Sequence, residues 1–113
     1  MSQHVFETVL HAMPVTVLMG WDRPLQGFFL MVSKDDEAEE KYLYSNLEDP
    51  ILDRNAAMAD SLKYFEDKLA ALGLSVPPEM LRELRKDCAL NVGNRYVNHT
   101  PDRQAQAREG DTT

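Results

Sequence analysis

Few residues of the types that do chemistry stand at spacings that would let them act together. The three histidines are His4, His11 and His99, and the single cysteine is Cys88. None of them forms an i, i+4 pair or a CxxC motif, so the spacing typical of a zinc site is missing. His4 and His11 are seven residues apart in an expected strand, which places them on opposite faces. We therefore predict no metal site and no cofactor.

Cys88 and His99 are the one pair that could support nucleophilic catalysis, since such partners need not be adjacent in sequence. However, Cys88 continues the apolar spacing of Leu81 and Leu84, where a cysteine usually behaves as a small buried hydrophobe. The glycine-rich phosphate loops and the nucleophile elbow GxSxG do not occur. Carboxylates are abundant, but abundance alone indicates no acid–base pair. We assign no catalytic residue and predict that the protein is not an enzyme.

The segment GWDRPLQG, residues 20–27, combines the only tryptophan with an acid and a base. Trp21 and Arg23 belong to the residue types most enriched at the energetic centres of protein interfaces. One interpretation is therefore a binding anchor made by Trp21, Asp22 and Arg23. The alternative is that Trp21 finishes the preceding strand and caps the core, under a loop stiffened by Pro24.

The segment NVGNRYVNH, residues 91–99, offers a second binding candidate. Asn94, Arg95 and Tyr96 provide hydrogen-bond donors and a ring that could stack, as a polar recognition patch would need. The alternative is a helix C-cap followed by a turn, because asparagine and glycine tolerate left-handed backbone. Arg95 would then complement the negative end of the helix dipole.

The net charge of −7 is concentrated in residues 35–67, which carry −8. Direct binding to nucleic acid is therefore disfavoured, because phosphate contacts need a basic face. Residues 62–87 could form a helix-turn-helix with Arg82, Arg85 and Lys86 toward phosphates, but an αα-hairpin that covers a sheet suits the acidic surroundings better. The acidic stretch either attracts a basic partner or only keeps the protein in solution.

The elements that must position these residues are strands followed by helices. Residues 4–11 predict a weak strand, and residues 41–45 predict a further strand. The runs VTVLM (15–19) and GFFLMV (27–32) predict two paired antiparallel strands. Nearly every residue in these two runs is apolar, so we expect both faces to be covered, either by this chain or by a second copy.

Two helices are expected after the strands. The first should run from an N-cap at Asp53 to Gly73, and its apolar stripe is Met58, Leu62, Phe65, Leu69 and Leu72. The second should begin at Pro77–Pro78 and end at Gly93. The sequence therefore predicts an α+β fold, in which a small antiparallel sheet of three to four strands is followed by two helices packed on one face.

The length of 113 residues predicts one domain, which we assign to residues 1–98. Residues 99–113 contain no apolar side chain larger than alanine, so we expect a disordered polar tail. The N-terminus does not resemble a signal peptide, and no run of apolar residues is long enough to span a membrane. With a single cysteine, these features lead us to expect a cytoplasmic location.

Three functional hypotheses follow. The first is a small interaction or regulatory protein that binds a protein partner, or a second copy of itself. The second is an acidic inhibitor that imitates nucleic-acid phosphates and blocks a basic protein, which requires the carboxylates of residues 35–67 to line one face. The third is a small ligand-binding or enzymatic domain, which requires a pocket that joins Trp21, Asp22 or Arg23 to Asn94, Arg95 or His99.

Overall fold

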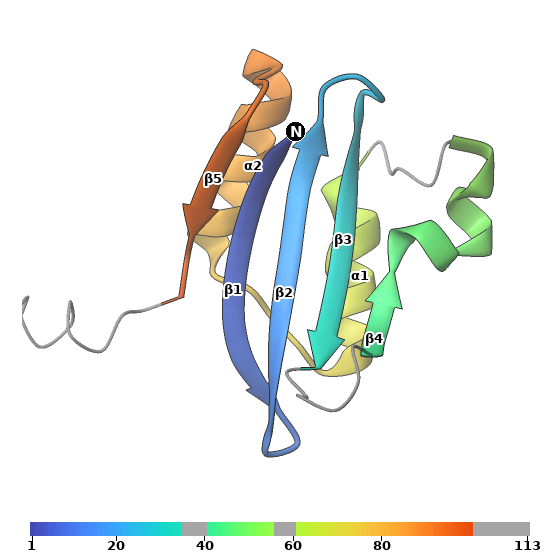
Figure 1. Ribbon diagram of the computed structural model, residues 1–113, viewed down its shortest axis with the longest axis vertical. Coiled ribbons are helices and arrows are strands. Elements are labelled where there is room, and N and C mark those ends of the chain that lie inside the picture. The colour runs from blue at the N-terminus through green and yellow to red at the C-terminus, as the bar shows by residue number, and fades with distance from the viewer. Residues whose placement is uncertain (35–40, 56–60, 101–113) are drawn as a thin grey trace, which may run out of the picture.

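The computed structural model shows a sheet with two helices packed on one of its faces (Figure 1). It describes residues 1–34, 41–55 and 61–100. The strand order is β4-β3-β2-β1-β5. The strands are β1 (Ser2–Leu10), β2 (Met13–Asp22), β3 (Gly27–Lys34), β4 (Lys41–Ser45) and β5 (Arg95–Asn98). The helices are α1 (Leu62–Leu72) and α2 (Pro78–Leu90), and two short 3-10 helices, η1 (Asn46–Glu48) and η2 (Pro50–Asn55), follow β4.

The α+β class is confirmed, but the expected sheet of three to four antiparallel strands is wrong in detail. The sheet has five strands and is mixed, because β5 pairs with β1 in parallel. Residues 95–98, for which the sequence indicated either a turn or a polar patch and no strand, form this edge strand. A four-residue strand that pairs with the other end of the chain has no local sequence signal, which is why the pattern analysis missed it.

The core lies between the sheet and the helices. Side chains alternate along a strand, so every second residue of β2 and β3 points toward α1 and α2. The buried core residues on these two strands are Val15, Val17, Met19, Trp21, Phe28, Leu30 and Val32. Phe65 of α1 and Leu84 of α2 are fully buried against them.

The helix boundaries agree partly with the expected ones. Gly73, at φ 86°, ends α1, and α2 begins at Pro78 as predicted. The N-cap of α1 is Ser61 and not Asp53, because Asp53 belongs to η2. Asn91, at φ 49°, ends α2 in place of Gly93, since asparagine also tolerates the left-handed conformation.

The loop in GWDRPLQG is shorter than the sequence indicated. The β2 and β3 strands pair up to Asp22 and Gly27, so only residues 23–26 form the turn. Gly20 lies within β2, where an added Cβ would stand 2.0 Å from the carbonyl oxygen of Ser2 and 2.3 Å from Cζ of Phe29. The Phe29 ring therefore occupies the space over Gly20.

Some expectations fall on residues that the structure does not describe. Met58 and residues 101–113 of the expected tail lie outside the described residues. His99 and Thr100, which the sequence assigned to the same tail, are described, and the backbone N–H of His99 donates to the Val5 carbonyl at 2.7 Å. None of the helices within the described residues is long and apolar enough to cross a membrane.

Candidate functional site

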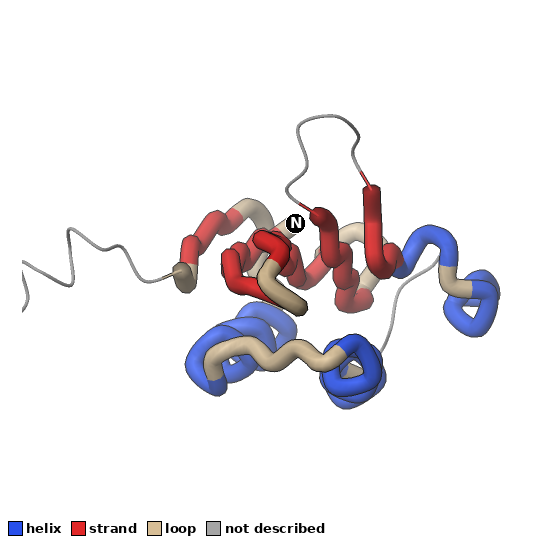
Figure 2. The backbone as a smooth tube through the Cα atoms, turned by 90° about the horizontal axis from the view of Figure 1, so that it is seen from below, coloured by secondary structure: helices blue, strands red, loops and turns tan. Residues whose placement is uncertain are grey.

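The two faces of the sheet are covered differently. Both α1 and α2 lie on one side of it (Figure 2). The opposite side, which we call the open face, carries no α-helix among the described residues. On the open face, β2 and β3 place Leu18 directly opposite Met31, and Phe29 opposite Gly20. This face is therefore apolar at its centre, although neither α1 nor α2 packs on it.

These side chains form the floor of a groove of about 170 Å³, which we call the apolar groove. It is lined by Met1, Gln3, Leu18, Phe29, Met31, Asn46 and Leu47. None of these seven side chains is ionisable. The groove can therefore accept an uncharged, apolar group without desolvating a charged side chain.

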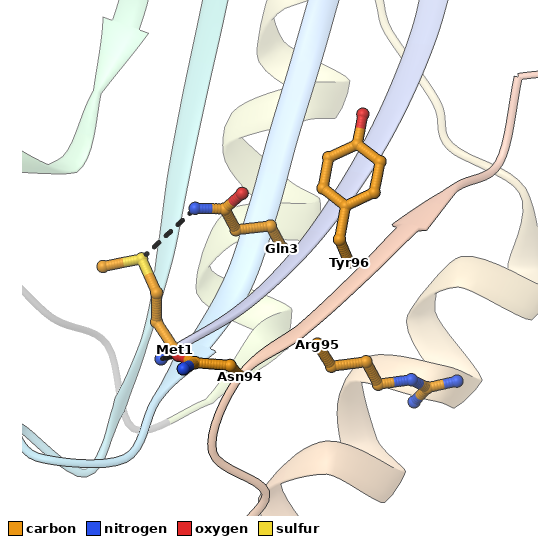
Figure 3. A pocket seen from close by; sticks show the side chains of 5 residues that line it. All are labelled: Met1, Gln3, Asn94, Arg95 and Tyr96. Carbon is orange, nitrogen blue, oxygen red and sulfur yellow. Dashed lines mark hydrogen bonds between the residues drawn. The ribbon is translucent and has the colours of Figure 1, made fainter.

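A second depression of about 380 Å³, which we call the polar hollow, lies beside it. It is lined by Met1, Gln3, Asn94, Arg95 and Tyr96 (Figure 3). The polar hollow and the apolar groove share Met1 and Gln3. Gln3 of β1 is directly opposite Tyr96 of β5, so both side chains point to the open face. The sequence candidates Asn94, Arg95 and Tyr96 thus lie at one end of a continuous concave surface.

Large apolar side chains stand exposed at the edge of this surface. Leu47 is 63% exposed, Tyr96 is 64% exposed and Met1 is 44% exposed. Phe29, in contrast, is only 5% exposed at the floor. Apolar groups that are exposed together around a groove are typical of interaction sites, whereas scattered ones are ordinary.

The other three sequence candidates lie elsewhere. Trp21 faces the helices, is 5% exposed, and donates its indole N–H to Oδ1 of Asn91 at 3.2 Å. The Asp22 carboxylate accepts the backbone N–H of Leu25 at 3.0 Å and so caps the turn. Arg23 is exposed near Gly93. The turn and the end of α2 therefore lie together, but Trp21, Asp22 and Arg23 line neither depression.

A buried polar network joins β1, α2 and β5 on the helix-covered face. Nε2 of His4 lies 2.6 Å from Oδ2 of Asp87, and both side chains are fully buried. Arg95 extends away from the open face and donates to Asp87 and to Glu83, each at 2.5 Å. Burial raises the pKa of Asp87, but hydrogen bonds from His4, Ser2 and Arg95 outweigh it and hold that pKa below its ordinary value. Asp87 is therefore ionised at neutral pH.

A second buried aspartate ties η1 and η2 to α1. Oδ2 of Asp49 accepts the hydroxyl of Tyr44 at 2.6 Å and that of Tyr64 at 2.7 Å. The ammonium group of Lys68 lies 5.2 Å from the centre of the Tyr64 ring. Burial and the bond to Asp49 raise the pKa of Tyr64 to about 12, and they raise that of Tyr44 further. These tyrosines therefore stay neutral at any physiological pH, which suits a structural clamp.

The sequence reasoning missed the Asp87 network and the groove floor. Asp87 follows Met80 and Leu84 at spacings of four and three, so an acid stands on the buried stripe of α2. Such an acid needs a buried partner, and this was the available signal. The groove floor had a signal too, since β2 and β3 are apolar on both faces. Among the described residues, no group of three or more side chains could hold a metal ion.

Comparison of the chain with protein-family models, with curated proteins and with solved structures returned no match.

Proposed function

We propose that this protein binds a partner protein through the open face of its sheet. The partner places an apolar side chain in the apolar groove, and its backbone or polar groups contact the polar hollow. The observation that carries this proposal is the apolar floor of Leu18, Phe29 and Met31 on a face that neither α1 nor α2 covers. Methionine and aromatic residues are enriched in the centres of interfaces, where charged residues are depleted.

The polar residues around the groove support an interface more than a second core. Gln3 and Asn94 carry amide groups that can donate to or accept from a peptide backbone. The Asn46 side chain is buried, and its Oδ1 accepts the backbone N–H of Leu30 at 3.3 Å, so it supports the groove from below. Asn94 already accepts a hydrogen bond at 3.2 Å from the amino group of Met1. An apolar centre with a polar, exposed rim is the usual anatomy of a protein interface.

Charge favours a basic partner. The protein carries a net charge of −7. Glu48, next to Leu47 of the groove, is exposed, and so is Glu7, which shares the open face with Gln3. A partner with lysine or arginine beside its apolar anchor would be steered to this surface and an acidic partner would be repelled.

The interaction hypothesis therefore moves from the Trp21 turn to the open face. Arg95 contributes through its backbone and the base of its side chain, since its guanidinium is committed to Asp87 and Glu83. The phosphate-imitation hypothesis requires a row of carboxylates from residues 35–67 on one face. Among those whose side chains are described, Asp49 is buried, and Glu66 and Asp67 are paired with Arg85 and Lys63. The exposed Glu48 does not make such a row by itself.

The test is selection of peptides from a random displayed library with the full chain as bait. We expect enrichment of peptides with one large apolar residue and neighbouring lysine or arginine. Leu47→Ser should weaken binding of a selected peptide about tenfold, because it removes most of one buried apolar contact. Leu90→Ser is the matched control, since Leu90 is 66% exposed and Leu47 is 63% exposed.

Two results would contradict the proposal. One is selection of peptides that are acidic or lack an apolar residue. The other is equal binding of the selected peptide by both leucine variants. Self-association of the wild-type chain that Leu47→Ser abolishes, measured by analytical ultracentrifugation, would assign the open face to a second copy instead.

A further inference from the structure

A chain of hydrogen bonds runs from Asp87 through His4 to His99. Nε2 of His4 lies 2.6 Å from the Asp87 carboxylate, and Nδ1 of His4 lies 2.7 Å from Nε2 of His99. The two rings are stacked with their centres 5.0 Å apart and their planes 21° apart. His4 is fully buried and His99 is half-buried. The chain thus links a buried acid to a histidine at the end of β5.

The number of protons that this arrangement can hold is limited. A carboxylate only accepts hydrogen bonds, so Nε2 of His4 carries a proton toward Asp87. One further proton fits between Nδ1 of His4 and Nε2 of His99. If both rings were protonated, both of these facing nitrogens would carry hydrogen, and neither could accept. The contact therefore tolerates one imidazolium and fails with two.

We propose that the Asp87–His4–His99 chain is a pH-sensitive latch. It holds the end of β5 against β1 while at least one ring is neutral, and it opens when both rings are protonated. Histidine is the side chain whose ordinary pKa lies in the range where such a switch responds to modest acidification.

The groups around His99 determine how readily it takes up a proton. Burial and the charge of His4 lower the pKa of His99, and the charge of Arg95 lowers it further. Glu79 and Glu83 of α2 act in the opposite direction. Arg95 and Glu83 are themselves paired, so the second proton is resisted chiefly by burial and by the first imidazolium.

Opening is expected at one end of β5 only. At the other end, Arg95 stays bound to Asp87 and Glu83, because guanidinium and these carboxylates keep their charges well below neutral pH. At the His99 end, two backbone contacts depend on the latch. The His99 N–H donates to the Val5 carbonyl, and the Glu7 N–H donates to Oγ1 of Thr100, both at 2.7 Å.

Amide hydrogen exchange measured by NMR between about pH 8 and about pH 5 tests this proposal, with rates corrected for intrinsic pH dependence. We expect the protection of the His99 and Glu7 amides to fall at least tenfold on acidification. The Leu74 amide, which donates to the Leu69 carbonyl at 2.8 Å, should keep its protection. Nitrogen-15 shifts of the two rings, recorded in the same samples, report how many protons the pair holds at each pH.

Two variants separate the latch from general acid destabilisation. His99→Gln keeps a side chain that can donate to or accept from His4 but cannot itself be charged, so it should lose the pH response. His11→Asn is the matched control, because His11 is an exposed histidine in a turn at φ 50°, which asparagine tolerates. It should keep the response.

The proposal is overturned if the His99 and Glu7 amides keep their protection while both rings become protonated. It is equally overturned if His99→Gln retains the pH response, or if His11→Asn removes it. If His99→Gln does not fold, amide exchange of the wild-type chain at each pH still tests the proposal by itself. Because no partner enters the experiment, its failure would leave the open-face proposal untouched.

Discussion

The strands β2 and β3 contribute apolar side chains to both faces of the sheet, but the two faces are buried to different extents. On the helix-covered face, β2 and β3 present side chains such as Val17 and Leu30, which are fully buried against α1 and α2. On the open face, the same strands present Leu18 and Met31, which are only half-buried at the floor of a groove. Apolar residues that the described part of the chain leaves partly exposed are the ones available to another molecule.

The largest difference between the faces should appear in stability. Phe65 is fully buried on the helix-covered face, so Phe65→Ala should cost about 3–5 kcal/mol of unfolding free energy. Met31→Ala on the open face should cost less, about 1–2 kcal/mol, since Met31 is only partly buried. Urea denaturation of both variants measures this. Equal losses would show that the open face is a core in its own right.

Gly20 should show an intermediate effect. An alanine Cβ at this position would collide with the Ser2 carbonyl and the Phe29 ring, so Gly20→Ala should cost about 1–3 kcal/mol through overpacking. The crowding arises on the open face, so the Phe29 ring signals should shift more than those of Phe65 in NMR spectra. An alanine variant with unchanged stability and an unmoved Phe29 ring would mean that the ring does not occupy the space over Gly20.

The smallest expected effect is the dependence of stability on pH. It should differ between the network of Asp87, which includes histidines, and the cluster of Asp49, which includes tyrosines. The folded-state pKa of His99 is lowered from 6.5, so the unfolded chain binds more protons as the pH falls through that range. The stability that neutral His99 contributes is present above about pH 6.5 and is lost below it. His99→Gln should reduce this slope of the urea midpoint against pH.

The Asp49 cluster should contribute nothing to that slope. Burial and the bond to Asp49 raise the pKa of both tyrosines, that of Tyr64 to about 12. The pKa of Asp49 is lowered, because hydrogen bonds from Tyr44 and Tyr64 outweigh the effect of burial. Tyr64→Phe should therefore lower the midpoint by the same amount at pH values near 7 and near 5. If the slope of the urea midpoint against pH changed with Tyr64→Phe and not with His99→Gln, the pH dependence would arise from the Asp49 cluster and not from His99.

The sequence predicted the parts of the fold that depend on local signals. Gly73 ended α1 as expected, and the paired runs of residues 15–19 and 27–32 form adjacent strands. β5 could not be predicted, because its strand character comes from pairing with β1 at the opposite end of the chain. The hydrogen bond between His4 and Asp87 could not be predicted either, because these residues are 83 positions apart in the sequence.

The candidate site was predicted only in part, for a related reason. Asn94, Arg95 and Tyr96 line the polar hollow, but the tryptophan that drew attention by its type faces the core. Residue type alone does not say which face of a strand is covered. That depends on where the helices pack, and Trp21 shares its face with Met19, toward the helices.

The measurement that tests the open-face proposal most directly is NMR mapping of a selected apolar, basic peptide on the full chain. We predict that backbone amide shifts change at Gln3, Leu18, Phe29, Met31 and Tyr96, around the groove and the hollow. Amides of the helices, such as those of Phe65 and Leu84, should remain in place. Shifts that cluster on α1 and α2, with the open face unchanged, would contradict the assignment of the binding surface.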